Sequence, residues 1–215
     1  MCLSKCYLEL SLSLILVISL TACGGSSGTE PNSNPIDNRA PQISGAPNAQ
    51  VIVEADYLFT PVASDADGDI LSFEIENKPL WANFNSTTGT LSGTPSTSDI
   101  NTTSNIIIKA SDGTLNTALP AFDLTVSYGS ATLSWNPPTE RADDTTLPLN
   151  EVAGYRIYYG NQQDQIQMLT DINDSSISEY VIDSLKAGSH YFAVTTYDIY
   201  NTESSLSNVQ SKIFE

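Results

Sequence analysis

Apolar residues recur at every second position in short segments along most of this chain. Between Pro41 and Phe214 these segments are separated by turn residues at intervals of roughly 8–12 positions, and no window keeps a helical period for more than a turn or two. Alternation of this kind places one side of a segment in a core and the other in solvent, as in a half-buried strand. The chain is therefore expected to be all-β, built from sandwiches of two sheets.

The alternating segments fall into two groups of similar length. In the first group we expect strands at 51–54, 57–62, 70–76, 90–92, 105–110 and 121–128. In the second group we expect strands at 131–135, 153–159, 166–169, 179–182, 191–197 and 209–214. The groups meet at Tyr128-Gly129-Ser130, a joint too short for free tumbling, so the sequence predicts two domains, 41–128 and 129–215.

The charge balance excludes several functions. The chain has 25 Asp and Glu against 8 Lys and Arg, a net charge of −17, so it cannot neutralise a run of phosphates and no nucleic acid partner is expected. The chain has a single histidine, His190, so a zinc site that needs several imidazoles is excluded. His190 is not expected to be a catalytic base either, because the sequence shows no evident nucleophile for it to activate. The sequence does not exclude a pair of carboxylates placed for glycoside hydrolysis. Small sandwiches leave little volume for a substrate cleft, however, so an enzyme is not expected.

The first 22 residues are typical of a secretory signal. After Met1 the only basic side chain in this segment is Lys5, and the run from Leu10 to Leu20 is apolar except for its serines. This run is shorter than the roughly 20 apolar residues that cross a bilayer. Residues 1–22 are therefore expected to be a cleaved signal peptide.

The sequence Leu20-Thr21-Ala22-Cys23-Gly24 resembles the lipobox of bacterial lipoproteins. The resemblance implies cleavage before Cys23, diacylglycerol on its thiol and a further acyl chain, such as palmitate, on its new amino group. Several chains anchor a protein stably because each buried methylene adds about 0.8 kcal/mol. Gly24 at the position after the cysteine implies the outer membrane of the bacterial cell envelope. The alternative is an ordinary cleaved signal with a stray cysteine near its end.

Residues 23–40 combine the cysteine with a flexible linker. From Gly24 to Ala40 the only large apolar side chain is Ile36, so this stretch cannot offset its ordering entropy by burial. As a flexible coil it would reach about 20–25 Å from the lipid surface. Cys2 and Cys6 leave with the signal peptide, so no disulfide is expected in the mature chain.

Five sequence blocks in the first domain carry a family resemblance. They are 64–69 (SDADGD), 71–73 (LSF), 79–81 (PLW), 88–95 (TGTLSGTP) and 110–113 (ASDG). Their order and spacing resemble the bacterial putative-Ig and dystroglycan-type cadherin-like domains, which implies an immunoglobulin-like β-sandwich. Gly89 and Gly93 are expected to permit turns with positive φ. Trp81 and Phe84 are expected to plug the core, and a sugar-stacking role for Trp81 is the alternative.

The acidic block raises a calcium hypothesis. Asp65, Asp67 and Asp69 alternate in a predicted loop, and calcium takes six to eight oxygen ligands. Related cadherin-like domains bind calcium through comparable loops, and the resemblance adds Asp112 as a further ligand. Glu54 and Asp99 have suitable positions but lie outside the matching blocks. The alternative is a solvated turn, since Asp bonds readily to its own backbone two residues on.

The second domain resembles a fibronectin type III domain over 129–213. The blocks that carry the resemblance are 133–138 (LSWNPP), 154–160 (GYRIYYG) and 185–207. Alternation predicts that Tyr155, Ile157 and Tyr159 face the core and that Arg156 and Tyr158 face outward. In the family the last block contains a tyrosine corner, whose phenol bonds back to the backbone.

Two features of the last block depart from the family. The resemblance assigns the corner to Leu185 and Tyr191, but Ala187 stands where the family usually has proline. A later loop, from Tyr197 to Glu203, carries Ile199 and Tyr200 where relatives commonly have small residues. We expect these two residues to be a candidate binding surface, because exposed aromatics are good contact makers. The alternative is that Ile199 packs beneath its own loop.

The sequence therefore predicts a non-enzymatic, lipid-anchored protein of the bacterial cell envelope. Two tandem immunoglobulin-like β-sandwiches would follow a cleaved signal and a flexible tether. The expected work is binding, adhesion or scaffolding, with or without calcium, toward an unknown protein or polysaccharide partner. An accessory carbohydrate-binding module at the cell surface is the alternative.

Overall fold

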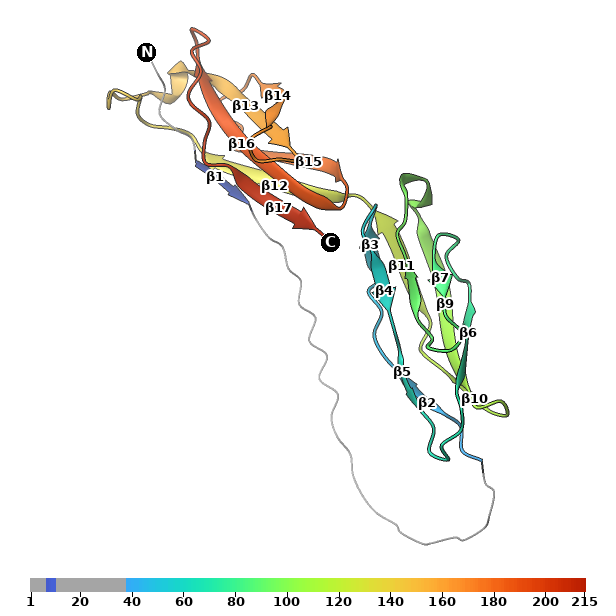
Figure 1. The fold of residues 1–215 in the computed structure, drawn as a ribbon. Coiled ribbons are helices and arrows are strands. Elements are labelled where there is room, and N and C mark those ends of the chain that lie inside the picture. Colours follow the sequence, from blue (N-terminus) through green and yellow to red (C-terminus); the bar gives the residue numbers. More distant parts are fainter. Residues whose placement is uncertain (1–6, 11–37) are drawn as a thin grey trace, which may run out of the picture.

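Two β-rich modules follow each other end to end in the computed structural model (Figure 1). The structure describes residues 7–10 and 38–215. Cys23, most of the predicted signal peptide and most of the predicted tether lie outside these residues. Within the described ranges, no helix has the length and apolar character needed to cross a membrane.

The first module is built from short strands on both sides of one core. Its elements are β2 (Gln42–Ser44), β3 (Gln50–Ile52), β4 (Tyr57–Phe59), β5 (Val62–Ser64), β6 (Ser72–Glu76), β7 (Asn83–Phe84), β8 (Leu91–Gly93), the 3₁₀ turn η1 (Thr97–Asp99), β9 (Thr102–Ser111), β10 (Asn116–Ala118) and β11 (Phe122–Ser127). The main sheet has the order β10-β9-β11-β3, with β6 also paired to β9. The pairs β2-β5 and β4-β8-β7 complete the module.

Alternation along β9 explains how the first core closes. Ile106, Ile108 and Ala110 are fully buried, and the residues between them are less buried. They pack in one cluster with Leu91 of β8 and with Val53, which directly follows β3. A period of two therefore supplies one apolar face, as the sequence predicts.

A glycine turn precedes β8. Gly89 has φ 71°, a conformation that L-residues with side chains rarely adopt. A Cβ there would also lie 2.6 Å from the Phe73 ring and 2.7 Å from Pro61. The predicted need for glycine at this turn is confirmed, for reasons of conformation and of space.

The second module is a sandwich of two sheets. Its elements are β12 (Gly129–Asn136), the 3₁₀ turn η2 (Leu149–Glu151), β13 (Val152–Gly160), β14 (Gln167–Ile172), β15 (Glu179–Leu185), β16 (Gly188–Asp198) and β17 (Gln210–Phe214). One sheet has the order β14-β13-β16-β17, and the other has the order β1-β12-β15, where β1 is Tyr7–Leu10.

The second core forms between these two sheets. Tyr155 and Ile157 of β13 are fully buried, and Tyr159 packs against the same cluster. The rings of Trp135 and Tyr155 lie 5.1 Å apart between their centroids. Arg156, by contrast, reaches exposed partners on the outer face. The predicted division of β13 into inward and outward residues is confirmed.

The structure differs from the predicted strands in several places. The segment expected at 57–62 is two strands, because Pro61 has no N–H to donate to a ladder. β4 pairs with β8, whereas β5 pairs with β2. The strands β1, β2, β7 and β10 have only two to four residues each, and they are not among the strands expected from the sequence.

β1 lies in the segment 1–22, which is expected from the sequence to be a signal peptide. It runs antiparallel to β12, with Tyr7 opposite Asn136 and Leu10 opposite Leu133 (Figure 1). It therefore forms the outer strand of the three-stranded sheet in the second module.

The two modules contact each other at a structured joint. The Ala187 N–H, in the turn between β15 and β16, donates to the Val53 carbonyl oxygen at 2.9 Å. Ala187 also packs against the core of the first module. Beside this bond the Lys186 ammonium lies 2.6 Å from the Glu54 carboxylate. The joint is thus fixed by a backbone bond, an apolar contact and an ion pair.

Candidate functional sites

The loop after β16 is held in a tight turn by a buried carboxylate. Asp198 is only 4% exposed, and its Oδ1 accepts the N–H groups of Tyr200 at 2.9 Å and Thr202 at 2.8 Å. Asn201 has φ 59° at the turn, and its N–H donates to the Asp198 carbonyl oxygen. The segment from Asp198 to Glu203, here called the display loop, therefore has a defined backbone shape.

The base of the display loop is tied to the connection before β13. The buried Arg141 forms an ion pair with Glu151, and its Nη1 lies 3.8 Å from Asp198 Oδ2. The Ile199 N–H donates to the Glu151 carbonyl oxygen at 3.1 Å. One side of the loop is therefore bound to a neighbouring segment through both side chains and backbone.

The other side of the display loop is fixed by Glu203. Its carboxylate accepts bonds from Thr195 and from Tyr158, the latter at 2.6 Å, and forms an ion pair with Arg156. Burial opposes ionisation of Glu203, but these bonds outweigh burial and hold its pKa below the usual value for glutamate.

Arg156 joins the loop to the outer face of β13. Its guanidinium donates to Asn201 Oδ1 at 2.7 Å, pairs with Asp171 at 3.0 Å and stands 4.4 Å from the centre of the Tyr197 ring. One planar cation thus connects the loop, β14 and β16.

Two apolar side chains project from this supported turn. Ile199 is 55% exposed and Tyr200 is 80% exposed. The exposure of Ile199 contradicts the alternative in which it packs beneath its own loop. Leu149, next to the segment that bonds the loop, is 54% exposed. The display loop therefore exposes apolar side chains on a backbone that hydrogen bonds hold in one shape. Exposed apolar surface on a fixed backbone is suited to contact with a partner.

The predicted calcium loop is held by internal partners. Asp65 Oδ1 accepts the Asp67 N–H at 2.8 Å and the Asp69 N–H at 3.3 Å. The Arg39 guanidinium and backbone N–H both bond the Asp67 carboxylate, at 2.7 and 2.8 Å, and lower its pKa. Arg39 therefore occupies oxygens that a cation would need.

Asp112 lies near the same end of the module but is also engaged. Its Oδ1 accepts the N–H groups of Thr114 and Leu115, both at 2.6 Å, and its Oδ2 accepts from Asn38 at 3.0 Å. Asn38 and Arg39 thus connect the loop of Asp112 with the loop of Asp67.

No three acidic, histidine or cysteine side chains gather around a common point in the described part of the chain. The other two acids considered for calcium lie elsewhere. Glu54 pairs with Lys186 at the joint, and Asp99 accepts from the Ser96 N–H at 2.8 Å. The predicted ligands therefore do not converge in the described residues as they stand, and calcium binding stays a prediction.

Trp81 and Phe84 both pack against the first core. The Trp81 ring meets the Tyr57 ring edge-on, with centroids 6.0 Å apart and planes at 88°. The interpretation of these residues as core plugs is confirmed.

The predicted tyrosine corner is wrong by one residue. His190, not Tyr191, turns inward, with Nε2 2.9 Å from the Lys186 carbonyl oxygen and Nδ1 2.8 Å from the Tyr159 hydroxyl. A carbonyl can only accept, so Nε2 carries the proton and Nδ1 accepts from Tyr159. Strand alternation places Tyr191 on the opposite face, where it is half-buried.

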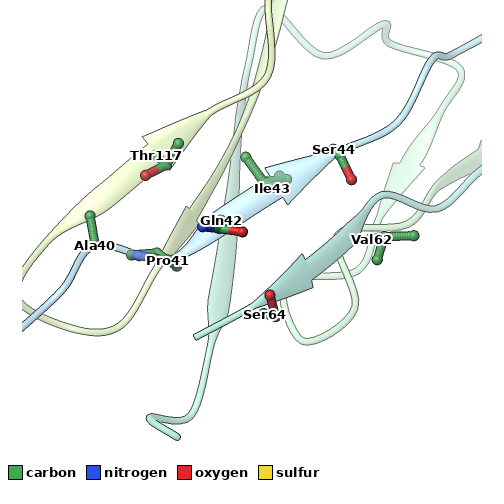
Figure 2. Close-up of a pocket in the computed structure, with 8 residues that line it drawn as sticks. All are labelled: Ala40, Pro41, Gln42, Ile43, Ser44, Val62, Ser64 and Thr117. Carbon is green, nitrogen blue, oxygen red and sulfur yellow. The ribbon is translucent and has the colours of Figure 1, made fainter. Parts of the chain in front are cut away.

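A depression of about 520 Å³ lies beside β2, where the described part of the first module begins (Figure 2). Its lining residues are Ala40, Pro41, Gln42, Ile43, Ser44, Val62, Ser64 and Thr117. None of these side chains is charged, so the depression is lined by no ionisable acid or base.

Comparison with known proteins identifies the first module. Residues 40–127 match the family model described as "Putative Ig domain". Among curated proteins, no sequence matches the chain. This match supports an immunoglobulin-like fold for the first module, and such a fold suggests a binding or adhesion-type module.

Several solved structures are similar to the chain. Fibronectin(III)-like modules of Clostridium thermocellum CbhA share 10% identity, with 81% of this chain and 94% of that chain covered and a TM-score of 0.32. The EC1-2 fragment of human protocadherin-24 shares 13%, with 82% and 94% covered and a TM-score of 0.33. A putative alpha-galactosidase from Bacteroides fragilis shares 16%, with a TM-score of 0.33; the match covers 43% of this chain and 18% of the galactosidase.

Proposed function

We propose that this chain is a non-enzymatic, lipid-anchored protein of the bacterial cell envelope that binds a partner protein through the display loop. The mature chain would begin at Cys23, with acyl chains that hold it in the outer membrane. The observation that carries the proposal is the display loop itself. Its apolar side chains Ile199 and Tyr200 are exposed, while the buried Asp198 fixes the backbone beneath them.

The position of the loop supports this role. The described part of the first module begins at residue 38, at the end of that module away from the joint, whereas the display loop lies at the far end of the second module (Figure 1). An anchor before residue 38 would therefore place the loop at the end of the molecule most distant from the lipid attachment.

The chemistry of the surface indicates the kind of partner. A net charge of −17 favours a cationic partner or one bridged by calcium, and disfavours direct contact with anionic lipid. Tyr200 has only two side-chain torsions to order on binding, so it can contribute contact area at low entropic cost. An adhesion or scaffolding contact with a protein fits both features.

Carbohydrate binding is the second candidate. The exposed Tyr200 ring could stack on a sugar, whereas the ring of Trp81 is covered in part by the first core. Retention of wild-type protein on a polysaccharide resin, lost in Tyr200→Ser, would favour this candidate over a protein partner.

The anchor is tested by intact mass spectrometry of protein purified from membranes. A mature chain that begins at Cys23 and carries the mass of a diacylglyceryl group is the expected result. Cys23→Ser is the matched control and should remain unprocessed and free of lipid. A wild-type chain that begins elsewhere, or that lacks fatty acid, would refute the anchor.

The loop is tested by proximity labelling from the anchored protein in intact cells. We expect a defined set of neighbours to disappear in the Ile199→Ser, Tyr200→Ser double variant. Leu80→Ser changes a 99% exposed apolar residue in the first module and serves as the control. Identical neighbours for all three proteins would contradict a role for the loop.

A further inference from the structure

The outer edge of β12 in the second module is the basis of a further inference. In the structure this edge is covered by β1, a strand from the other end of the chain. The two strands pair antiparallel over four residues, from Tyr7 opposite Asn136 to Leu10 opposite Leu133. The edge of β12 therefore has a geometry that accepts an extended segment.

The backbone of β12 shows which groups face this edge. The Trp135 N–H donates to the Ser178 carbonyl oxygen at 3.0 Å, on the β15 side. Backbone groups of successive residues in a strand point to opposite edges. The backbone groups of Ser134 and Asn136 therefore point toward β1.

The face of β12 beneath the edge is apolar. Leu133 and Trp135 are buried in the second core, and they stand opposite Leu10 and Leu8 in the register. A strand added at this edge continues the sheet. Every second side chain of the added strand would then lie on the same face of the sheet as Leu133 and Trp135. Main-chain bonds and alternate apolar residues are the two requirements for binding by strand addition.

Processing would remove the strand that covers the edge. This step rests on the proposed function, because cleavage before Cys23 takes Tyr7–Leu10 away with the signal peptide. The segment that remains, 24–40, contains Ile36 as its only large apolar residue and prolines at 31 and 35. It cannot provide an alternating apolar strand in place of β1.

We infer that the edge of β12 is a strand-accepting site, covered by Tyr7–Leu10 in the precursor and open in the mature protein. The occupant in the mature protein is an extended segment of another protein, with apolar side chains at alternate positions. Cleavage of the signal peptide would then make the protein competent to bind this partner. An exposed edge of this kind is otherwise a site for unwanted pairing.

The test measures hydrogen exchange of the backbone amides of Ser134 and Asn136. Three samples are compared: the full chain with Cys23→Ser, the chain 24–215, and the chain 24–215 with a synthetic peptide. The peptide spans residues 5–12 with Cys6→Ser. The chain 24–215 contains every residue of both core clusters, so both modules remain complete apart from β1.

We expect the two amides to exchange slowly in the full chain and faster in the chain 24–215. Adding the peptide should restore slow exchange. A peptide with Leu8→Pro and Glu9→Pro should have no effect, because proline has no N–H and one of these two adjacent residues must face β12 in the strand. Ser134→Pro in the chain 24–215 should lose peptide binding, since proline is tolerated where an edge N–H faces solvent. Ser134→Ala is the matched control and should bind the peptide.

The inference is overturned if the peptide leaves the exchange of Ser134 and Asn136 unchanged. It is also overturned if the chain 24–215 pairs with a second copy through this edge, seen as a dimer that protects the same amides. Neither result depends on lipid attachment, which mass spectrometry tests separately. Failure of the strand site and failure of the proposed anchor are therefore distinguishable.

Discussion

The backbone N–H of Ala187 donates to the carbonyl oxygen of Val53 across 2.9 Å, and this bond connects the two modules. The position of Ala187 is the one where fibronectin type III domains usually have proline. A proline has no N–H and could not make this bond. This departure from the pattern that the module resembles therefore supplies the donor N–H of the joint.

Ala187→Pro should therefore loosen the joint without unfolding either core. The lost hydrogen bond is worth about 0.5–1.5 kcal/mol, and the ion pair of Lys186 with Glu54 is too exposed to replace it. Small-angle scattering should show a wider distribution of distances in this variant. Ala187→Ser keeps the N–H and should scatter like the wild type; equal scattering from all three proteins would show that the bond does not fix the joint.

His190 should contribute more to stability than Tyr191. His190→Phe keeps a ring of similar size but removes the bonds to Lys186 and Tyr159. It leaves a carbonyl without its donor, at a cost of about 1–3 kcal/mol. Tyr191→Phe should shift the urea midpoint little, because in the described residues its hydroxyl has no hydrogen-bond partner. If Tyr191→Phe lowered the urea midpoint more than His190→Phe, the tyrosine corner would belong to Tyr191 after all.

The second module should lose stability in acid through Glu203 and Asp171. The bond from Tyr197, with Arg156, lowers the pKa of Asp171, and the bonds described above lower that of Glu203. A lowered pKa in the folded state stabilises it above the unfolded pKa of about 4, and this stabilisation is lost as the pH falls through the folded pKa.

Thermal melts between about pH 6 and pH 2 test this expectation. Glu203→Gln should show a flatter loss of melting temperature with falling pH than the wild type. Asp164→Asn, at an exposed loop position, is the control and should follow the wild type. A wild-type slope in Glu203→Gln would contradict the assigned role of its carboxylate.

Calcium binding predicts a specific competition with Arg39. A calcium ion on the acidic loop must displace the Arg39 guanidinium from Asp67. The calcium hypothesis therefore predicts a higher melting temperature in millimolar calcium than in chelator, and a larger difference in Arg39→Ala. At a concentration of about 100 times Kd the gain is about 2.7 kcal/mol. Equal melting in calcium and chelator, in both proteins, would leave the loop as a turn closed by Arg39.

The strands with strong alternation could be predicted from the sequence. β9 and β13 each bury every second residue along part of their length, so their period of two is visible in the residues themselves. β2, β7 and β10 could not be predicted in this way, because two or three residues carry no periodic signal. Their existence depends on the partner strands that the fold brings beside them.

The candidate site was only partly visible in the sequence. Ile199 and Tyr200 stand out because large apolar residues are unusual in a loop of this position. The support beneath them was missed, since Arg141 and Glu203 reach Asp198 and Arg156 across the fold, not along the chain. Asp198 itself carries a local signal, because an Asp that opens a turn often accepts the N–H two residues on. The pairing of Asp67 with Arg39 likewise joins residues far apart in sequence.

The central claim is that the display loop is the surface that meets the partner. The most direct measurement places a photo-reactive amino acid at position 200 of the anchored protein and, separately, at position 80, where Leu80 is even more open to solvent than Tyr200. After irradiation of intact cells, the account predicts a discrete crosslinked protein from position 200 that is absent from position 80. No adduct from position 200, or the same adducts from both positions, would contradict it.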